Sequence, residues 1–190
     1  MSIKTETKTE STAMYVLRLA MTLLIITAVV AALLAGVNAI TKDKIAAIQA
    51  EKTAKALATV LSDGASAKQI EFTDVSGLIT AVYESESGYA IQVAPNGFGG
   101  AVTLMVGVTK DGTVSGISVI SHVETAGLGA VAAESTAKGE AFRGQYVGMS
   151  GTLAVDKDGG EVDSISGATI TSRAVTNGVN AALAWVAKNG

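Results

Sequence analysis

Residues 19–37 read LAMTLLIITAVVAALLAGV, nineteen residues without a charged side chain. As an α-helix this stretch would be about 28 Å long, at roughly 1.5 Å per residue, which matches the hydrocarbon core of a bilayer. Thr22 and Thr27 are compatible with such a helix, because their hydroxyl groups can donate to backbone carbonyls of the helix itself. The stretch therefore predicts a single transmembrane helix surrounded by the lipid bilayer.

A cleaved signal peptide is the alternative interpretation of the same stretch. Arg18 precedes it, and Val37-Asn38-Ala39 has the small residues of a processing site, which would make the mature chain begin near Ile40. The apolar stretch is longer than the roughly 7 to 15 residues of most signal-peptide cores, which favours the anchor. Lysines stand on both sides of the stretch, so charge alone does not predict the orientation in the membrane.

The composition argues against several classes of protein. The 190 residues include 14 Lys+Arg and 17 Asp+Glu, and a formal charge of −3 is not typical of a nucleic-acid binder. There is no cysteine, and His122 is the single histidine, so thiolate sites and clustered imidazole ligands are excluded. We therefore expect no metal site and no catalytic side chain, and an organic cofactor would have to supply any redox chemistry.

The sequence divides into four predicted segments. Residues 1–18 form a short polar leader, residues 19–37 the transmembrane helix, and residues 38–64 a helical stalk that ends at Ser62-Asp63-Gly64. Residues 65–190 follow as one folded domain, which is long enough to bury its own core.

The domain begins with short alternating apolar runs and ends with a helical pattern. Asp111-Gly112 is a strong hairpin-turn signal between two of the runs. Helices are predicted over residues 131–145 and 170–189. The fold class is therefore α+β with an antiparallel sheet, and the predicted strands are residues 70–75, 78–84, 89–94, 101–109, 113–123 and 152–155.

Residues 163–172 read DSISGATITS and lie between the sheet region and the last helix. Ser, Thr and Asp are common at helix starts, so a plain helix cap is one interpretation of this segment. Gly167 permits a close backbone approach, and Ala168 leaves little bulk beside Thr169. A hydroxyl at the helix N-terminus would lie where free N–H groups and the macrodipole favour an anion such as a phosphate ester.

A membrane anchor followed by an α+β domain with D-x-x-S-G-A-T before its last helix resembles a known family. It is similar to the flavin-carrying G subunit of Rnf-type ion-translocating ferredoxin:NAD oxidoreductases and to its homologue, the C subunit of sodium-translocating NADH:quinone oxidoreductases. The positions that match are Asp163, Ser166, Gly167, Ala168 and Thr169. The resemblance implies FMN attached by a phosphoester bond to Thr169, which would make the chain a flavoprotein and, through the ester, a phosphoprotein.

In that family a separate flavin transferase moves FMN from FAD to the acceptor threonine. The resemblance therefore implies a transferase as partner during maturation, with Asp163 orienting the segment toward it. A second similar region is the family's H-x-E-T-P-G-L-G loop, which here carries Ala126 in place of proline. The implied cofactor-binding residues are Ser166, Gly167, Ala168 and Thr169, together with Glu124, Thr125, Gly127, Leu128 and Gly129 of this loop.

The resemblance implies an electron-carrying subunit of an ion-translocating complex, without an active site of its own. It would be a single-pass protein of the cell membrane, with the flavin domain on the extracytoplasmic side and other membrane subunits as partners. Three alternatives stay open: the quinone-reductase C subunit, a stand-alone membrane-tethered flavoprotein reductase, and an anchored binding module in which S-G-A-T is only a helix cap.

Overall fold

The computed structural model describes residues 12–74 and 76–190. One helix, α1 (Thr12–Val60), extends through the predicted transmembrane segment and continues into the predicted stalk of residues 38–64 as far as Val60. The chain divides into two compact units, Met1–Gln49 and Ala50–Gly190. Residues 1–11 of the predicted leader lie outside the described residues, as does Val75 at the end of the first predicted strand.

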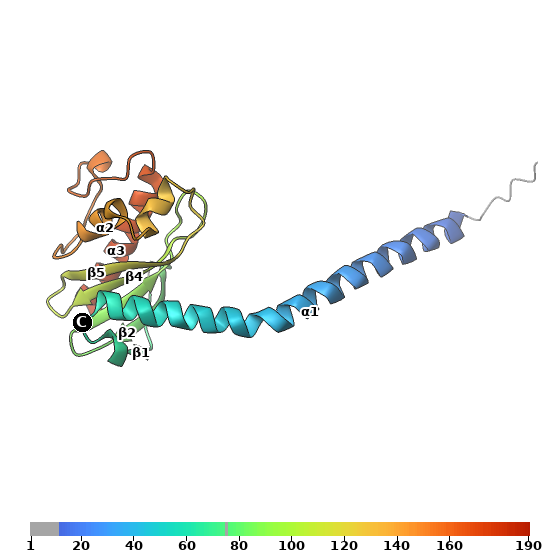
Figure 1. The fold of residues 1–190 in the computed structure, drawn as a ribbon, viewed down its shortest axis with the longest axis horizontal. Helices are drawn as coiled ribbons and strands as arrows, with labels where there is room; N and C mark the ends of the chain where they lie inside the picture. Colours follow the sequence, from blue (N-terminus) through green and yellow to red (C-terminus); the bar gives the residue numbers. More distant parts are fainter. Residues whose placement is uncertain (1–11, 75) are drawn as a thin grey trace, which may run out of the picture. The chain divides into compact units, whose positions relative to one another are not determined.

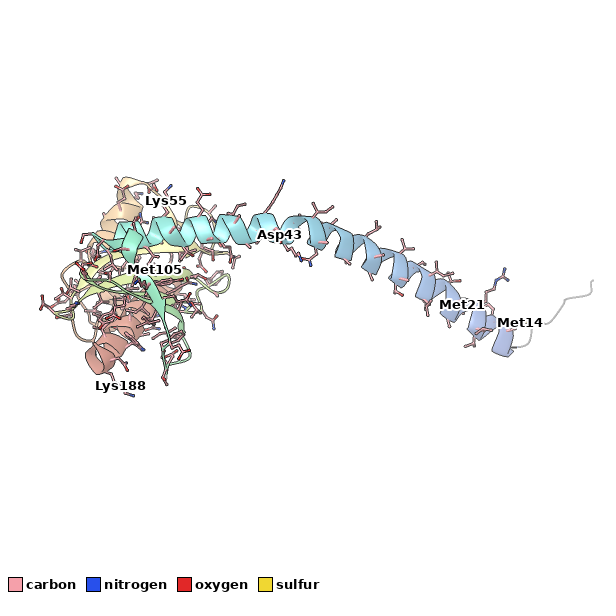
Figure 2. The ribbon with its side chains drawn as sticks, turned by 90° about the horizontal axis from the view of Figure 1, so that it is seen from below. Met14, Met21, Asp43, Lys55, Met105 and Lys188 are labelled. Carbon is pink, nitrogen blue, oxygen red and sulfur yellow. The ribbon has the colours of Figure 1, made fainter. Side chains whose placement is uncertain are left out.

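The first unit is the apolar part of α1. Its large apolar side chains are exposed all around the helix, as Figure 2 shows from Met14 to Met21 and beyond. Thr22 and Thr27 donate to the carbonyls of Arg18 and Leu23 at 2.8 and 2.9 Å, which confirms the predicted bonds to the helix backbone. This helix is long and apolar enough to cross a membrane.

The second unit is built on a five-stranded antiparallel sheet in the order β1-β2-β3-β4-β5. Each strand pairs with the next along the chain, and the turn at Asp111-Gly112 joins the last two, as predicted. The α+β class with an antiparallel sheet is therefore confirmed. The strands are β1 (Lys68–Ile70), β2 (Ile79–Glu84), β3 (Gly88–Val93), β4 (Thr103–Thr109) and β5 (Val114–Ser121).

Both faces of the sheet are covered. Successive side chains of a strand point to opposite faces, and in the central strands apolar side chains point to both. In β4, Leu104 and Val106 belong to the core on the face that carries α3 (Thr169–Asn189). Met105 points to the other face, where it packs against Ala56 and Leu57 in the last turns of α1 (Figure 2). The sheet therefore lies between the end of α1 and the C-terminal helices.

Glycines in the sheet let the end of α1 approach closely. A Cβ at Gly107 would lie 2.3 Å from the Val60 carbonyl oxygen, and one at Gly116 would lie 3.2 Å from the Val60 Cα. Ser115 Oγ also donates to the Val60 carbonyl at 2.6 Å. Beyond α1, Asp63 accepts hydrogen bonds from the backbone and hydroxyl of Ser87 in the β2–β3 turn. These contacts fix the helix end on the sheet.

The opposite face carries α3, α2 (Ala137–Gly144) and the 3₁₀ helix η2 (Gly129–Ala133), as Figure 1 shows. Tyr146 and Trp185 are buried in this core. A Cβ at Gly178 would lie 2.9 Å from Val93 Cγ2, so this glycine is where α3 comes close to the sheet.

The structure differs from three of the predicted elements. Residues 152–155 are not a strand, because Val155 makes only one parallel bridge to Val162 and the backbone bonds of this segment are local. The first strand begins earlier and ends at Ile70. The helix predicted over residues 131–145 is divided into η2 and α2, since Thr136 caps α2 by accepting from the Gly139 N–H at 3.3 Å.

Candidate functional site

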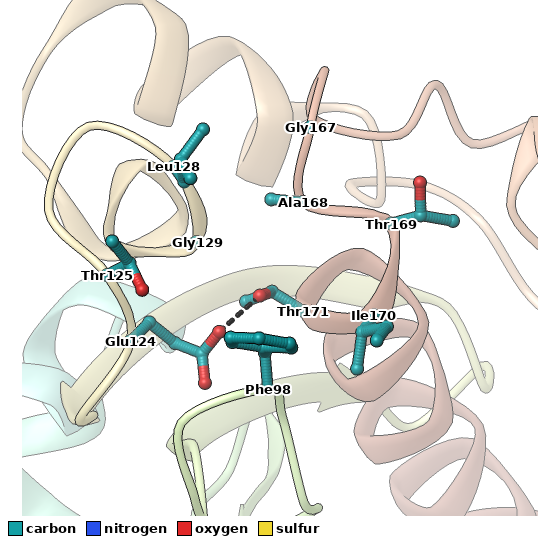
Figure 3. Close-up of a pocket in the computed structure, with 10 residues that line it drawn as sticks. All are labelled: Phe98, Glu124, Thr125, Leu128, Gly129, Gly167, Ala168, Thr169, Ile170 and Thr171. Atoms are coloured by element: carbon teal, nitrogen blue, oxygen red, sulfur yellow. Dashed lines mark hydrogen bonds between the residues drawn. The ribbon is translucent and has the colours of Figure 1, made fainter.

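Three segments that are distant in sequence meet at one end of the sheet. They are the β3–β4 connection, the segment after β5, and the first turn of α3. In this antiparallel sheet β3 and β5 run in the same direction and finish at the same end of the sheet. The β3–β4 connection and the segment after β5 therefore lie close together. They enclose a cavity of about 360 Å³, lined by Phe98, Glu124, Thr125, Leu128, Gly129, Gly167, Ala168, Thr169, Ile170 and Thr171 (Figure 3).

The segment after β5 forms a tight loop around the Thr125 carbonyl. This oxygen accepts from the N–H groups of Leu128 and Ala130 at 3.2 and 3.1 Å. Gly127 has a φ of +74°, which other residues rarely adopt, so the glycine is required by the turn. Leu128 is left exposed at the mouth of the cavity, and a Cβ at Gly167 would lie 3.2 Å from its Cδ2.

Side chains of other elements hold the backbone of the D-x-x-S-G-A-T segment. Gln145 accepts from the Asp163 N–H at 2.8 Å and donates to the Asp163 carbonyl at 3.2 Å. Asp156 Oδ1 accepts from the Ser164 N–H at 3.1 Å, and hydrogen bonds from Ser164 and Lys157 hold the pKa of Asp156 below its usual value. The segment is therefore fixed in place although it belongs to no helix or strand.

The segment then turns into α3. The Ala168 N–H donates to the Ile165 carbonyl at 2.9 Å, and Gly167 inside this turn has a φ of +76°. Ser172 Oγ, from the first turn of α3, accepts from the Ile165 N–H at 3.0 Å and donates to the Ala168 carbonyl at 3.1 Å. The geometry thus depends on a glycine at position 167 and on a serine inside the helix.

Thr169 is the first residue of α3 and is half-buried. The N-cap residue is Ala168, which makes no side-chain cap, so the interpretation of this segment as a plain hydroxyl or carboxylate cap is wrong. In the described structure no protein group accepts from the N–H groups of Thr169, Ile170 or Thr171. The Thr169 hydroxyl points away from Glu124 and Thr171, toward the outside of the cavity (Figure 3).

A buried carboxylate joins the three walls of the cavity. Glu124 is only 8% exposed. Its Oε1 accepts from the Gly99 N–H at 2.8 Å in the β3–β4 connection, and its Oε2 accepts from the Thr171 hydroxyl in α3. Its own N–H donates to His122 Nδ1 at 3.2 Å. We call Gly99, Glu124 and Thr171 the Glu124 cluster.

The predicted cofactor-binding residues fall around two neighbouring hollows. The cavity described above contains Glu124, Thr125, Leu128, Gly129, Gly167, Ala168 and Thr169 of the predicted set. Ser166, Gly127 and the predicted transferase-recognition residue Asp163 line a second hollow of about 500 Å³, together with residues of α2. No group of three or more His, Asp or Glu side chains that could hold a metal ion occurs among residues 12–74 and 76–190.

Three residues that line the cavity are not among the predicted site residues: Phe98, Ile170 and Thr171. Phe98 is 71% exposed. The available signal was its position in Gly97-Phe98-Gly99-Gly100, because a large apolar side chain in a glycine-rich loop has few reasons to be there except contact with a ligand or partner.

Two family models match this chain. The family model described as the FMN-binding domain matches residues 97–184, which contain every residue of the cavity. The family model described as the RnfG N-terminal region matches residues 14–60, most of α1. Residues 61–96, which include β1 to β3, lie outside both matches.

Some relatives match along most of the chain and others over about half of it. The G subunit of the ion-translocating oxidoreductase complex of Methanosarcina acetivorans is 32% identical over 176 residues, covering 87% of this chain and 91% of the relative. The G subunit of the Na⁺-translocating ferredoxin:NAD⁺ oxidoreductase complex of Acetobacterium woodii is 32% identical over 186 residues, covering 87% and 88%. The G subunit of the ion-translocating oxidoreductase complex of Aliivibrio fischeri is 44% identical over 106 residues, covering 54% of this chain and 50% of the relative.

Proposed function

Because the chain belongs to the family of G subunits of Rnf-type ion-translocating oxidoreductase complexes, we propose that it is the FMN-carrying electron-transfer subunit of such a complex. The observation that carries the proposal is the cavity in which Gly167, Ala168 and Thr169 meet the Glu124–Gly129 loop, inside the region that matches the FMN-binding domain. A flavin in this cavity would accept and donate electrons singly or in pairs and so link one-electron and two-electron partners.

The cavity has the size of a small-molecule site and a lining compatible with a flavin. Its volume of about 360 Å³ lies in the range of small-molecule sites, roughly 300 to 1,000 Å³. Phe98, Leu128 and Ile170 provide apolar surface for an aromatic ring system, and all three side chains are exposed. The free N–H groups at the start of α3 provide donors for a phosphate, and the helix dipole favours its charge.

We further propose that Thr169 Oγ1 carries the FMN through a phosphoester bond. The transferase would break the pyrophosphate bond of FAD, join the FMN phosphate to Thr169, and release AMP and the hydroxyl proton. Thr169 suits an acceptor, because its side chain is half-buried and points outward, and its phosphate would lie beside the free N–H groups of α3. Asp163 is exposed and close enough along the chain to be recognised by the transferase.

The remaining residues have supporting roles in this proposal. Residues 19–37 anchor the chain in the cell membrane, residues 38–64 form the stalk, and residues 65–190 form the flavin domain on the extracytoplasmic side. Gly127, Leu128 and Gly129 shape the loop against which the flavin ring lies. One membrane helix cannot by itself form an ion path, so ion transport belongs to other membrane subunits, which are the partners that co-purification from native membranes would reveal.

Intact mass after co-expression with a flavin transferase tests the attachment. The wild-type chain and Thr169→Ser are expected to gain one FMN, and Thr169→Val is expected to gain none, because valine has nearly the shape of threonine without the hydroxyl. Thr152→Val is the matched control, since it removes the hydroxyl group of an exposed threonine outside the cavity and should leave the modification intact. Peptide mass spectrometry across residues 162–173 locates the adduct, and a flavinylated Thr169→Val chain would disprove the proposed linkage.

A further inference from the structure

Glu124 is a buried carboxylate in the wall of the proposed flavin cavity. Among residues 12–74 and 76–190 no lysine, arginine or histidine side chain forms an ion pair with it. Removing a carboxylate from water without a cationic partner is costly, and such groups persist only where other contacts compensate. Packing of the loop alone therefore does not explain a carboxylate at position 124.

The compensation comes from two donors on opposite walls of the cavity. The Gly99 N–H donates to one carboxylate oxygen at 2.8 Å, and the Thr171 hydroxyl donates to the other. Hydrogen bonds to a charged acceptor are about twice as strong as those between neutral groups. Both oxygens thus accept from protein donors, and the Glu124 cluster ties the β3–β4 connection to the first turn of α3.

Two glycines leave the space that the carboxylate occupies. A Cβ at Gly97 would lie 2.5 Å from Oε1, and a Cβ at Gly129 would lie 2.4 Å from Oε2. Neither glycine has a positive φ, so backbone conformation does not require a glycine at either position. The added Cβ would also meet Val102 Cγ2 at 2.9 Å from position 97 and Thr171 Oγ1 at 2.4 Å from position 129, so both glycines leave room for the carboxylate and its surroundings.

We propose that Glu124 sets the reduction potential of the flavin, in addition to positioning the walls of its cavity. The inference rests on the proposed function, because it requires a flavin in the cavity that Glu124 lines. Adding electrons to a group held there brings negative charge near a fixed negative charge, in surroundings where water screens poorly. The carboxylate therefore opposes reduction and lowers the potential at which it occurs.

Two substitutions separate the charge of Glu124 from its hydrogen bonds. Glu124→Gln removes the charge but retains the contacts, since the amide oxygen accepts from Gly99 and the amide nitrogen donates to the Thr171 hydroxyl, which can reverse its role. Thr171→Val removes one hydrogen bond but retains the charge. Glu124→Asp retains the charge on a shorter side chain.

The test is the midpoint potential of the full-length, FMN-loaded chain in detergent. It is measured by redox titration, in which the visible absorption of the flavin reports the reduced fraction. Glu124→Gln is expected to shift the potential upward, while Thr171→Val and Glu124→Asp stay nearer to the wild-type value. Glu86→Gln is the matched control: it makes the same change in net charge at an exposed residue of the β2–β3 turn, at the opposite end of the sheet, and should cause no shift.

Each result bears on the inference. A Glu124→Gln potential equal to that of wild type and Glu86→Gln would overturn it, as would equal upward shifts in Glu124→Gln and Thr171→Val, which would assign the effect to packing alone. A Glu124→Gln chain that does not fold or carries no FMN also counts against it, because the inference requires the amide to keep both contacts. A wild-type chain without FMN would instead contradict the proposed function.

Discussion

Replacing Gly129 by alanine is a direct test of the Glu124 cluster. Gly129 is buried at the start of η2, and an added Cβ would lie 2.4 Å from both Glu124 Oε2 and Thr171 Oγ1. Contacts under 3.0 Å are essentially never observed, so both atoms must retreat by about 0.6 Å, and the hydrogen bond between them cannot survive unchanged.

The cost follows from that broken contact. A hydrogen bond to a charged group contributes about 1.5 to 3 kcal/mol, and overpacking a filled site costs about 1 to 3 kcal/mol. The lower chain entropy of alanine in the unfolded state returns about 0.4 to 1 kcal/mol. We therefore expect Gly129→Ala to lower the free energy of unfolding by about 1.5 to 5.5 kcal/mol.

Urea unfolding of the full-length chain in detergent provides the assay, because Trp185 is the single tryptophan and is buried in the core. Gly144→Ala is the control: this glycine ends α2, has no atom within 4 Å of an added Cβ, and should gain about 0.5 to 1 kcal/mol. In a Thr171→Val background the Gly129→Ala cost should shrink, because the hydrogen bond is already gone. The reasoning is refuted if Gly129→Ala matches Gly144→Ala, or if its cost is unchanged without the Thr171 hydroxyl.

Two further predictions concern the core and the stalk. Burial raises the pKa of Tyr146 to about 12, with the Thr176 hydrogen bond opposing, so its contribution to stability is complete below pH 10 and is lost as the pH rises toward 12. Urea unfolding at pH 9 and 11 should show a smaller alkaline loss in Tyr146→Phe than in wild type; equal losses would exclude Tyr146 as a source. Gly107→Ala should lower the free energy of unfolding by about 1 to 3 kcal/mol, because its Cβ would lie 2.3 Å from the Val60 carbonyl oxygen, whereas Gly36→Ala, with no atom within 4 Å, should not destabilise the chain.

The local patterns of the sequence predicted most elements correctly. The apolar stretch, the hairpin turn and the last helix were all found, since each depends on residues within a few positions of one another. Prediction was wrong over residues 152–155, where β-type residues form a loop instead of a strand. There the Asn180 side chain bonds the Leu153 backbone N–H and carbonyl, both at 2.8 Å, a contact from another element that local spacing does not reveal.

The candidate site likewise combines features that local sequence patterns predicted with contacts between distant elements. The sequence by itself singled out Thr169 and the glycine loop, because each lies in a continuous motif that resembles a known family, and the role of Thr169 as the flavin acceptor stays a proposal. Only the tertiary structure brought them into one cavity and added Phe98, Ile170 and Thr171. The Glu124 hydrogen bonds join residues 25 and 47 positions apart, and such pairs are set by strand order and by the packing of α3 on the sheet, which no local pattern encodes.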